Sequence, residues 1–290
     1  MELKILVYVK KEWSPDLLQE KFPAEEISEV TEAALREKRL SVQEVLLIAS
    51  TDASIRAALA MGMAVAAYVN PLFPGQTYAG VPMVIEGFEE VDPDFLDRIY
   101  RRCHALPWTI AETKRCVIRE FSMADMGALI DLYDQPGVTY RINHKGERIP
   151  GFIEPLYPLE QEWDYEEAYI ANMYKYYGYG MWLITEKKTG TVIGRAGLEH
   201  REYEEGVELE LGYVIAPLWQ RQGIATEVCR KILDFAEKNL DFPRVNALTD
   251  PDNGASVALL KKLGFSYLET TAVSGSSMYR FQKPLHKRPK

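Results

Sequence analysis

The chain has 290 residues, a formal net charge of -9 and 47% hydrophobic residues. This length predicts one large or two ordinary domains, and the hydrophobic content is sufficient for buried cores. The acidic balance argues against general nucleic-acid binding, which needs a basic face, and favours a cationic substrate. The three cysteines, Cys103, Cys116 and Cys229, match neither a metal-binding spacing nor a disulfide framework.

The first residues form a short apolar stretch flanked by charge, without the pattern of a signal peptide. No apolar run is long enough to span a membrane. We therefore expect a cytoplasmic protein with no metal, no membrane partner and no nucleic-acid partner. The sequence carries no signal for its oligomeric state.

The first hundred residues alternate between strand and helix patterns. We expect strands at residues 4–9, 44–49, 63–69 and 82–85, and helices at residues 24–38, 53–61 and 92–102. Asp92 is expected to cap the last of these helices, with Pro93 in its first turn. This alternation is typical of α/β domains and predicts a Rossmann-like parallel sheet with helices, in a domain covering residues 1–105.

Within this domain, a buried strand is followed by Ala49-Ser-Thr-Asp52, then by a helix that ends near Gly62 and Met63. This order resembles the distal half of the haloacid-dehalogenase phosphatase core. That family's paired catalytic aspartates are missing, because residues 4–13 contain no aspartate, so an aspartyl-phosphate mechanism cannot run. We expect a degenerate domain with a docking or regulatory role. Asp52 is then interpreted as a helix N-cap in preference to a magnesium ligand.

Residues 103–112, with Pro107 and Trp108, are interpreted as a packed linker to a second domain at residues 113–285. In that domain we expect strands at residues 115–119, 180–186, 192–198, 208–215 and 244–249, and helices at residues 124–133, 165–177 and 226–240. Ser122 is expected to cap the first helix. Residues 134–161 are expected to form a long irregular loop, which is typical of a functional segment.

The most informative motif lies between the strand at residues 208–215 and the helix that follows it. The loop Gln220-Arg-Gln-Gly-Ile-Ala225 places a glycine directly before a helix N-terminus. The first N–H groups of a helix have no intrahelical partner and carry partial positive charge. Gly223 allows backbone to approach a ligand closely. The pattern therefore indicates an anion site, and a phosphate-bearing cofactor is the expected occupant.

Further motifs follow in a fixed order: a strand at residues 244–249, then Asn253-Gly-Ala-Ser256, then Leu263-Gly-Phe265. Together with the loop, this order resembles the GNAT superfamily of acetyl-CoA-dependent N-acetyltransferases, over residues 113–282. The Leu-Gly-Tyr-Val-Ile run at residues 211–215, and a serine at position 256, resemble the branch that acetylates ribosomal-protein N-termini. The resemblance implies a mixed α/β sheet whose two central parallel strands splay apart.

The resemblance also implies which residues hold acetyl-CoA. The pantetheine arm would lie between the splayed strands, pairing with the backbone of Val214 and Ile215, while Asn253 would bond the arm or a nearby water. The pyrophosphate would lie on the backbone N–H groups of the loop. The cofactor-binding residues of this loop are expected to be Gln220, Arg221, Gln222, Gly223, Ile224, Ala225 and Thr226.

Acetyl transfer to an amine needs a group that removes a proton from the amine. Glu208 and Glu210 are two residues apart on a strand, so their side chains share a face. A carboxylate partly buried beside the splay would have a raised pKa, as a base requires. We expect Glu210 to be the general base, ahead of Glu208, with Glu199 and His200 as further candidates.

Many GNAT enzymes use a tyrosine as general acid, four residues before the glycine of the last motif, and this chain has Leu260 there. Serine at position 256 resembles the acid of the ribosomal-protein branch, so Ser256 is the candidate acid. A serine in the first turn of a helix can equally bond only to backbone, and both interpretations stay open.

The amine substrate, a small molecule or a peptide, is expected to meet a segment rich in acidic and aromatic residues. Its members are Glu154, Tyr157, Glu160, Glu162, Trp163, Asp164, Tyr165, Glu166, Glu167 and Tyr169. Such a mixture suits a cation, although a solvated face over an aromatic core explains most of these residues. The leading hypothesis is an N-acetyltransferase. The alternatives are a non-catalytic acyl-CoA sensor, which Leu260 favours, and a phosphatase, which the missing aspartates oppose.

Overall fold

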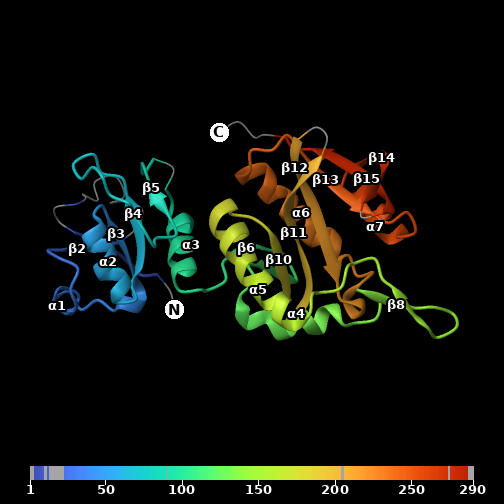
Figure 1. Cartoon of the computed structure of the whole chain (residues 1–290), viewed down its shortest axis with the longest axis horizontal. Coiled ribbons are helices and arrows are strands. Elements are labelled where there is room, and N and C mark those ends of the chain that lie inside the picture. Colours follow the sequence, from blue (N-terminus) through green and yellow to red (C-terminus); the bar gives the residue numbers. More distant parts are fainter. Residues whose placement is uncertain are drawn as a thin grey trace. The chain divides into compact units, whose positions relative to one another are not determined.

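The computed structural model describes residues 3–9, 12, 23–89, 91–203, 206–273 and 275–286. The chain divides into two compact units, Met1–Trp108 and Thr109–Lys290 (Figure 1). The first contains a parallel sheet and the second a mixed sheet, so the fold is α/β in both.

The sheet of the first unit has the order β2-β1-β3-β4-β5, and all its pairs are parallel. Its strands are β1 (Ile5–Val9), β2 (Ala24–Ile27), β3 (Val45–Ala49), β4 (Ala64–Tyr68) and β5 (Val84–Ile85). The helices are α1 (Glu32–Glu37), α2 (Asp52–Ala60) and α3 (Pro93–Cys103), with the 3-10 turn η2 (Val42–Glu44) before β3. The predicted Rossmann-like parallel arrangement is therefore present.

Both faces of this sheet are covered, which explains the uninterrupted apolar run of β3. Leu46 and Ile48 pack with Leu96 and Tyr100 of α3 on one face. Leu47 belongs to the other cluster, with residues of α1 and α2. A strand buried on both faces needs apolar side chains at every position.

Two local predictions in this unit are wrong. Residues 24–27 form β2 where a helix was expected, and only Glu32–Glu37 is helical, capped by Thr31. The helix propensity of the glutamates is overridden because residues 24–27 pair in parallel with β1. At α2 the N-cap is Thr51, whose side chain accepts from the N–H of Ser54.

Asp52 is the first residue of α2 rather than its cap. Its carboxylate accepts the backbone N–H groups of Thr77 and Tyr78, at 3.0 and 2.9 Å. These bonds, Thr77 first, lower the pKa of Asp52. The carboxylate therefore holds the loop after β4. The expected cap of α3 is confirmed, since Asp92 accepts from the N–H of Phe95 at 2.7 Å.

The second unit is built on an eight-stranded sheet with the order β14-β15-β13-β12-β11-β10-β7-β6. The strands are β6 (Thr109–Glu112), β7 (Cys116–Arg119), β10 (Met181–Glu186), β11 (Val192–Tyr203), β12 (Gly206–Ile215), β13 (Arg244–Thr249), β14 (Ser266–Val273) and β15 (Ser276–Pro284). Every neighbouring pair is antiparallel except β12–β13. The long strands β11 and β12 lie in the middle of this sheet (Figure 1).

The helices of this unit are α4 (Met126–Tyr133), α5 (Leu159–Tyr169), α6 (Ile224–Asn239) and α7 (Gly254–Lys262). Short turns η3 (Met123–Asp125) and η5 (Pro217–Trp219) precede α4 and α6. Alternation along β11 sends Arg195 and Glu199 toward α5 and its neighbours, where they contact Glu166 and Tyr169. On the opposite face of the sheet, the Trp182 ring of β10 contacts Phe235 of α6.

Three predicted segments differ in this unit. The expected linker contains β6, which pairs with β7. The expected irregular loop contains the hairpin β8 (Tyr140–Ile142) and β9 (Arg148–Pro150), as well as the start of α5. The helix predicted at residues 165–177 begins earlier, at Leu159, and continues as the π-helix η4 (Ile170–Tyr177). Hydrophobic periodicity and composition do not distinguish such short strands from loops, or a π-helix from an α-helix.

Candidate active site

The two parallel strands β12 and β13 pair only at their first shared positions. The register contains Leu209 with Val245 and Glu210 with Asn246, and no later pair within these two described strands. From Leu211 onward β12 continues beside β11 but no longer beside β13. The expected splay of the central strands is therefore present in the structure.

The edge of β12 that faces this splay is defined by strand alternation. The N–H of Ala216 donates to Ile193 O at 2.8 Å, so residues of the same parity bond to β11. Val214 has that parity and pairs with Arg195. The Val214 backbone therefore faces β11 and not the splay. Tyr213 and Ile215 present their backbone groups to the splay, and Gln220 Nε2 already donates to Ile215 O at 2.8 Å.

The loop after η5 has the geometry of an anion site. Two residues take left-handed backbone, Arg221 at φ 56° and Gly223 at φ 80°. Glu227 is the first residue whose N–H reaches back to a loop carbonyl, that of Gly223 at 3.1 Å. The preceding N–H groups of Ile224, Ala225 and Thr226 therefore have no intrahelical acceptor and can bind phosphate oxygens.

Side chains of the loop stiffen it from within. Gln222 Nε2 donates to Leu218 O at 2.8 Å, in addition to the bond of Gln220 described above. Gly223 is the N-cap of α6 and offers no side-chain bond. A Cβ there would meet only Arg115 Nη2, at 3.8 Å, so the glycine is required for its positive φ rather than for space.

Arg115, which the motif analysis missed, anchors this loop from the start of β7. Its Nη1 donates to Gln222 O at 3.0 Å, and its Nε and Nη2 donate to Glu227 Oε2 at 2.9 and 2.8 Å. Its partners lie more than a hundred residues away in sequence, so no local pattern could reveal the contact.

We expect Arg115→Ala to raise the KM for acetyl-CoA about tenfold while changing kcat little, because hydrogen bonds from a charged donor stabilise by about 1.5–3 kcal/mol. Isothermal calorimetry with coenzyme A should show the same loss. Arg36→Ala, at an exposed pair in the first unit, is the control. An unchanged dissociation constant for Arg115→Ala would contradict this role.

A cavity of about 470 Å³ lies beside the same loop. Its lining consists of Gly223, Thr226, Glu227, Arg230, Lys231, Asp234 and Lys262. Glu227 is held by Arg115, so three cations face one remaining free carboxylate there. This surplus of positive charge suits the phosphate end of a nucleotide cofactor.

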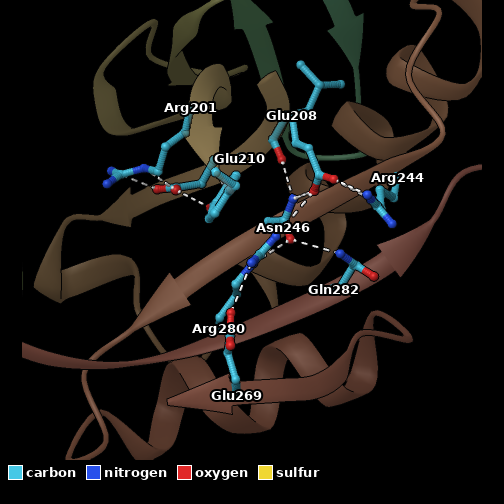
Figure 2. Close-up of polar contacts among 10 residues, drawn as sticks. Arg201, Glu208, Glu210, Arg244, Asn246, Glu269, Arg280 and Gln282 are labelled. Atoms are coloured by element: carbon cyan, nitrogen blue, oxygen red, sulfur yellow. Dashed lines mark hydrogen bonds and ion pairs between the residues drawn. The ribbon is translucent and has the colours of Figure 1, made fainter. Parts of the chain in front are cut away.

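On the α5 side of the sheet, β12 carries the two acidic residues predicted as candidate bases (Figure 2). Glu208 is buried, and its carboxylate accepts from Arg244 Nε, from Asn246 Nδ2 at 2.5 Å and from Arg280 Nη2 at 3.4 Å. Asn246 lies between Glu208 and Arg280, whose Nε donates to Asn246 Oδ1 at 3.1 Å. Glu208 therefore joins β12 to β13 and β15, directly before the two positions at which β12 and β13 pair.

Glu210 has fewer partners. Its carboxylate accepts from Arg201 Nε and Nη2 at 2.5 and 3.3 Å and from the Tyr203 hydroxyl at 2.9 Å, and its side chain is 16% exposed. Burial raises the pKa of Glu210, while Arg201 and Tyr203 lower it and Glu199 raises it, leaving it above the ordinary value. A raised pKa of this kind is what a general base needs.

Glu199 lies directly opposite Glu210 in the β11–β12 register. Opposed residues of an antiparallel pair have Cβ atoms about 5 Å apart and share a face. Glu199 accepts the Tyr169 hydroxyl at 3.0 Å, and that hydroxyl in turn accepts the N–H of Met181 at 2.6 Å. No ion pair of Glu199 occurs within the described part of the chain. His200 points to the other face, where its ring contacts Tyr177.

The candidate acid lies on the α7 side of the sheet. Asn253 is the N-cap of α7 and its Oδ1 accepts from the N–H of Ser256 at 3.1 Å. The Ser256 Oγ is 2.7 Å from the Tyr213 hydroxyl. Leu260 is fully buried, and so adds no polar group to this place. Asn253 keeps its Nδ2 group for a ligand, since no described residue accepts from it.

In the acidic and aromatic segment, some of the acidic side chains are buried and bonded within the protein, so they are not available to a substrate. Glu166 is fully buried against Arg195, and Glu162 accepts the N–H of Tyr157 at 2.8 Å. The exposed members are Glu154, Tyr157, Glu160, Trp163, Asp164, Tyr165 and Glu167. These side chains leave an acidic, aromatic surface on α5 and the loop before it.

Other expectations concern groups that take no part in this site. Cys103, Cys116 and Cys229 are all free thiols. Across the described ranges, no three His, Cys, Asp or Glu side chains are grouped to hold a metal ion. Nor is any described helix long and apolar enough to cross a membrane.

A mixed sheet with splayed parallel strands, followed by a helix whose first N–H groups can bind an anion, is the arrangement expected of an acyl-CoA-dependent transferase. Residues 115–266 match the family of the acetyltransferase (GNAT) domain, which is just over half of the chain, so the protein belongs to this family. The matched residues form an acetyltransferase domain, and the cofactor of the family is acetyl-CoA. The likeness of the first unit to the haloacid-dehalogenase core stays a prediction.

Several curated relatives are Bacillus proteins. "Uncharacterized protein YkkB" of Bacillus subtilis is 33% identical over 96 residues, which are 33% of this chain and 56% of that protein. The chain thus spans only about half of YkkB. "Uncharacterized N-acetyltransferase YoaA" of Bacillus subtilis is 30% identical over 156 residues, covering 54% of this chain and 82% of that protein.

Solved structures with a similar fold include a putative GnaT-family acetyltransferase from Bordetella pertussis. It is 22% identical with a TM-score of 0.48, and covers 60% of this chain and 98% of that one. The ribosomal L7/L12 alpha-N-protein acetyltransferase RimL, in complex with coenzyme A, is 15% identical with a TM-score of 0.47. It covers 61% of this chain and 98% of that one.

Proposed function

We propose that the protein transfers an acetyl group from acetyl-CoA to a primary amine, by direct attack of the amine on the thioester. The observation that carries this proposal is the pairing of β12 with β13 at only two positions, next to a helix whose first N–H groups are free. Acetyl-CoA supplies the activated acetyl group. The protein holds the amine and the thioester next to each other, and this positioning is the largest expected contribution to the rate.

The residues of this site divide into two binding regions. The N–H groups of Ile224, Ala225 and Thr226 would hold the pyrophosphate, and the nearby cations Arg230, Lys231 and Lys262 would attract the remaining phosphate. The backbone edge of Tyr213 and Ile215, in place of Val214, would pair with the pantetheine arm. Asn253 would donate to the arm through its side-chain amide.

Glu210 is proposed as the general base that takes a proton from the amine, directly or through water. Its raised pKa and its position at the last paired residue of β12 support this role. Glu208 is less suited, because it is buried and two arginines and an asparagine donate to its carboxylate, whereas Glu210 has one arginine and one tyrosine as partners. Glu199, on the same face, would add negative charge that attracts a cationic acceptor.

The acceptor is proposed to be a cationic small molecule or a basic peptide N-terminus. The exposed acidic and aromatic side chains of α5 and its preceding loop support this, through charge and cation–π contact. The finer likeness to ribosomal-protein acetyltransferases belongs to the same proposal, as does a cytoplasmic location.

The test is turnover with acetyl-CoA and a panel of polyamines, basic peptides and ribosomal proteins, read as release of free thiol and as the mass of the acetylated product. Turnover on at least one class of amine is expected. No thiol release with any amine, together with no binding of coenzyme A in calorimetry, would refute the proposal.

A non-catalytic acyl-CoA sensor is the second candidate, favoured by the buried Leu260 at the place of the usual tyrosine. The two functions differ in one result. A sensor would bind coenzyme A without releasing thiol from acetyl-CoA with any amine, whereas the enzyme would release it.

A further inference from the structure

Tyr213 and Ser256 form an isolated pair of hydroxyl groups beside the splayed strands. Tyr213 lies on β12 beyond its last contact with β13, and its hydroxyl is 2.7 Å from the Ser256 Oγ in the first turn of α7. For both side chains, this is the only hydrogen bond within the described part of the chain. The two residues are 43 positions apart, and no local sequence pattern connects them.

The hydrogen bond joins two hydroxyl groups, either of which could donate. Burial raises the pKa of Tyr213, because the ionised form is disfavoured between the sheet and α6, so the phenol keeps its proton. A phenol is a better donor than an aliphatic hydroxyl, and a buried donor without a partner costs about 1–3 kcal/mol. With Tyr213 as the donor, the proton of Ser256 is free for another acceptor.

Ser256 is in turn held at two points. Its N–H donates to the Asn253 side chain at 3.1 Å, and its Oγ lies 2.7 Å from the Tyr213 hydroxyl. A serine bonded only to backbone could rotate its hydroxyl freely, whereas a bond from the phenol occupies one of the two lone pairs of Oγ. The two contacts together restrict the directions open to the Ser256 O–H.

We propose that Tyr213 is a positioning residue that orients the Ser256 O–H toward the sulfur of bound coenzyme A, and that Ser256 stabilises the thiolate by a hydrogen bond. This inference rests on the proposed function. When the bond between carbon and sulfur breaks, the electron pair stays on sulfur and Ser256 donates to it without losing its proton. The proton of the amine goes to Glu210.

This arrangement accounts for the absence of a tyrosine at position 260. Leu260 follows Ser256 by about one helical turn and is fully buried. In this chain the phenol comes from strand β12 instead of α7, and it acts through Ser256.

The experiment measures affinity by calorimetry for coenzyme A and for desulfo-coenzyme A, which lacks the sulfur, at about pH 9, above the pKa of about 8.5 of a free thiol. The wild type is expected to bind coenzyme A about tenfold more tightly than the desulfo compound. Tyr213→Phe should remove several-fold of that advantage and leave affinity for desulfo-coenzyme A unchanged. Ser256→Ala should remove all of it, and the double variant should match Ser256→Ala.

Turnover provides a second measurement. Tyr213→Phe should lower kcat several-fold without raising the KM for acetyl-CoA, and Ser256→Thr, which keeps a hydroxyl, should retain most of the activity. Equal weakening of both ligands would show a merely structural role for Tyr213, and additive losses in the double variant would show that it does not act through Ser256. Either result overturns the inference.

Different results would refute the proposed function and the role of Tyr213. If the wild type binds neither compound and releases no thiol, the proposed function falls and this inference falls with it. If the wild type binds and turns over normally but Tyr213→Phe shows no selective loss on coenzyme A, only the inference falls. Should Tyr213→Phe fold poorly by circular dichroism, Ser256→Ala tests the same bond from its other end.

Discussion

Glu210→Gln is expected to lower kcat about 100-fold or more while leaving the KM for acetyl-CoA unchanged. A glutamine keeps the size of the side chain and a hydrogen bond with Tyr203, but it cannot accept a proton, and general-base catalysis contributes about 10²–10⁴-fold. Steady-state kinetics on the best amine of the panel measures this. Glu202→Gln, an exposed residue on the neighbouring strand, is the matched control.

If Glu210 is the base, its protonation should set the fall in activity at the acidic end of the pH profile. Burial first, with a smaller contribution from Glu199, keeps the pKa of Glu210 above its ordinary value despite Arg201. The base works when deprotonated, so activity should fall as the pH drops through that raised pKa. Arg201→Met removes an interaction that lowers the pKa and should move the acid limb to higher pH. A limb that stays in place, or moves to lower pH, would exclude Glu210 as the base.

Glu166→Gln should destabilise the second unit strongly, by about 3–5 kcal/mol, which corresponds to a fall in Tm of roughly 10 °C or more. Glu166 is fully buried, and it accepts from Arg195 Nη1 and Nη2 at 2.6 and 3.1 Å. Removing one partner leaves an uncompensated buried charge. Burial alone would lower the pKa of Arg195, but the Glu166 carboxylate holds it well above the ordinary value.

Thermal unfolding of the full chain measures this effect, with Glu32→Gln as the control. Glu32 pairs with Arg36 at 2.8 Å on an exposed helix face, and such pairs contribute only about 0.5 kcal/mol or less. The double variant Glu166→Leu with Arg195→Met should recover most of the lost stability, because an apolar pair carries no desolvation cost. A small effect of Glu166→Gln alone would mean that water reaches this pair.

Several elements followed directly from local pattern. The strand at residues 244–249 has the predicted bounds, the apolar run of β3 is buried at every position, and α3 begins at its predicted cap. Each of these is encoded within a few residues by apolar spacing or by a capping side chain. The segment at residues 24–38 failed for the opposite reason, because pairing with β1 outweighed helix propensity.

For the two candidate bases, the sequence pattern was not sufficient to choose between them. Spacing places Glu208 and Glu210 on one face of β12 but does not distinguish them. Glu208 is occupied because β13 brings Arg244 and Asn246 to it and β15 brings Arg280. Glu210 keeps a partly exposed carboxylate next to the splay. The difference depends on the partners of Glu208, which are 36, 38 and 72 positions away from it in the sequence.

The sequence by itself determined the family, and it predicted the loop at residues 220–226 as the cofactor site and the strand that carries the candidate bases, because these depend on short motifs whose residue types serve one local geometry. Only the tertiary structure decided that Arg115 anchors the loop, that Tyr213 rather than Val214 borders the splay, and that Tyr213 meets Ser256. Those contacts join strands and helices distant in the chain, and strand alternation and register, which set them, emerge only when the sheet is assembled.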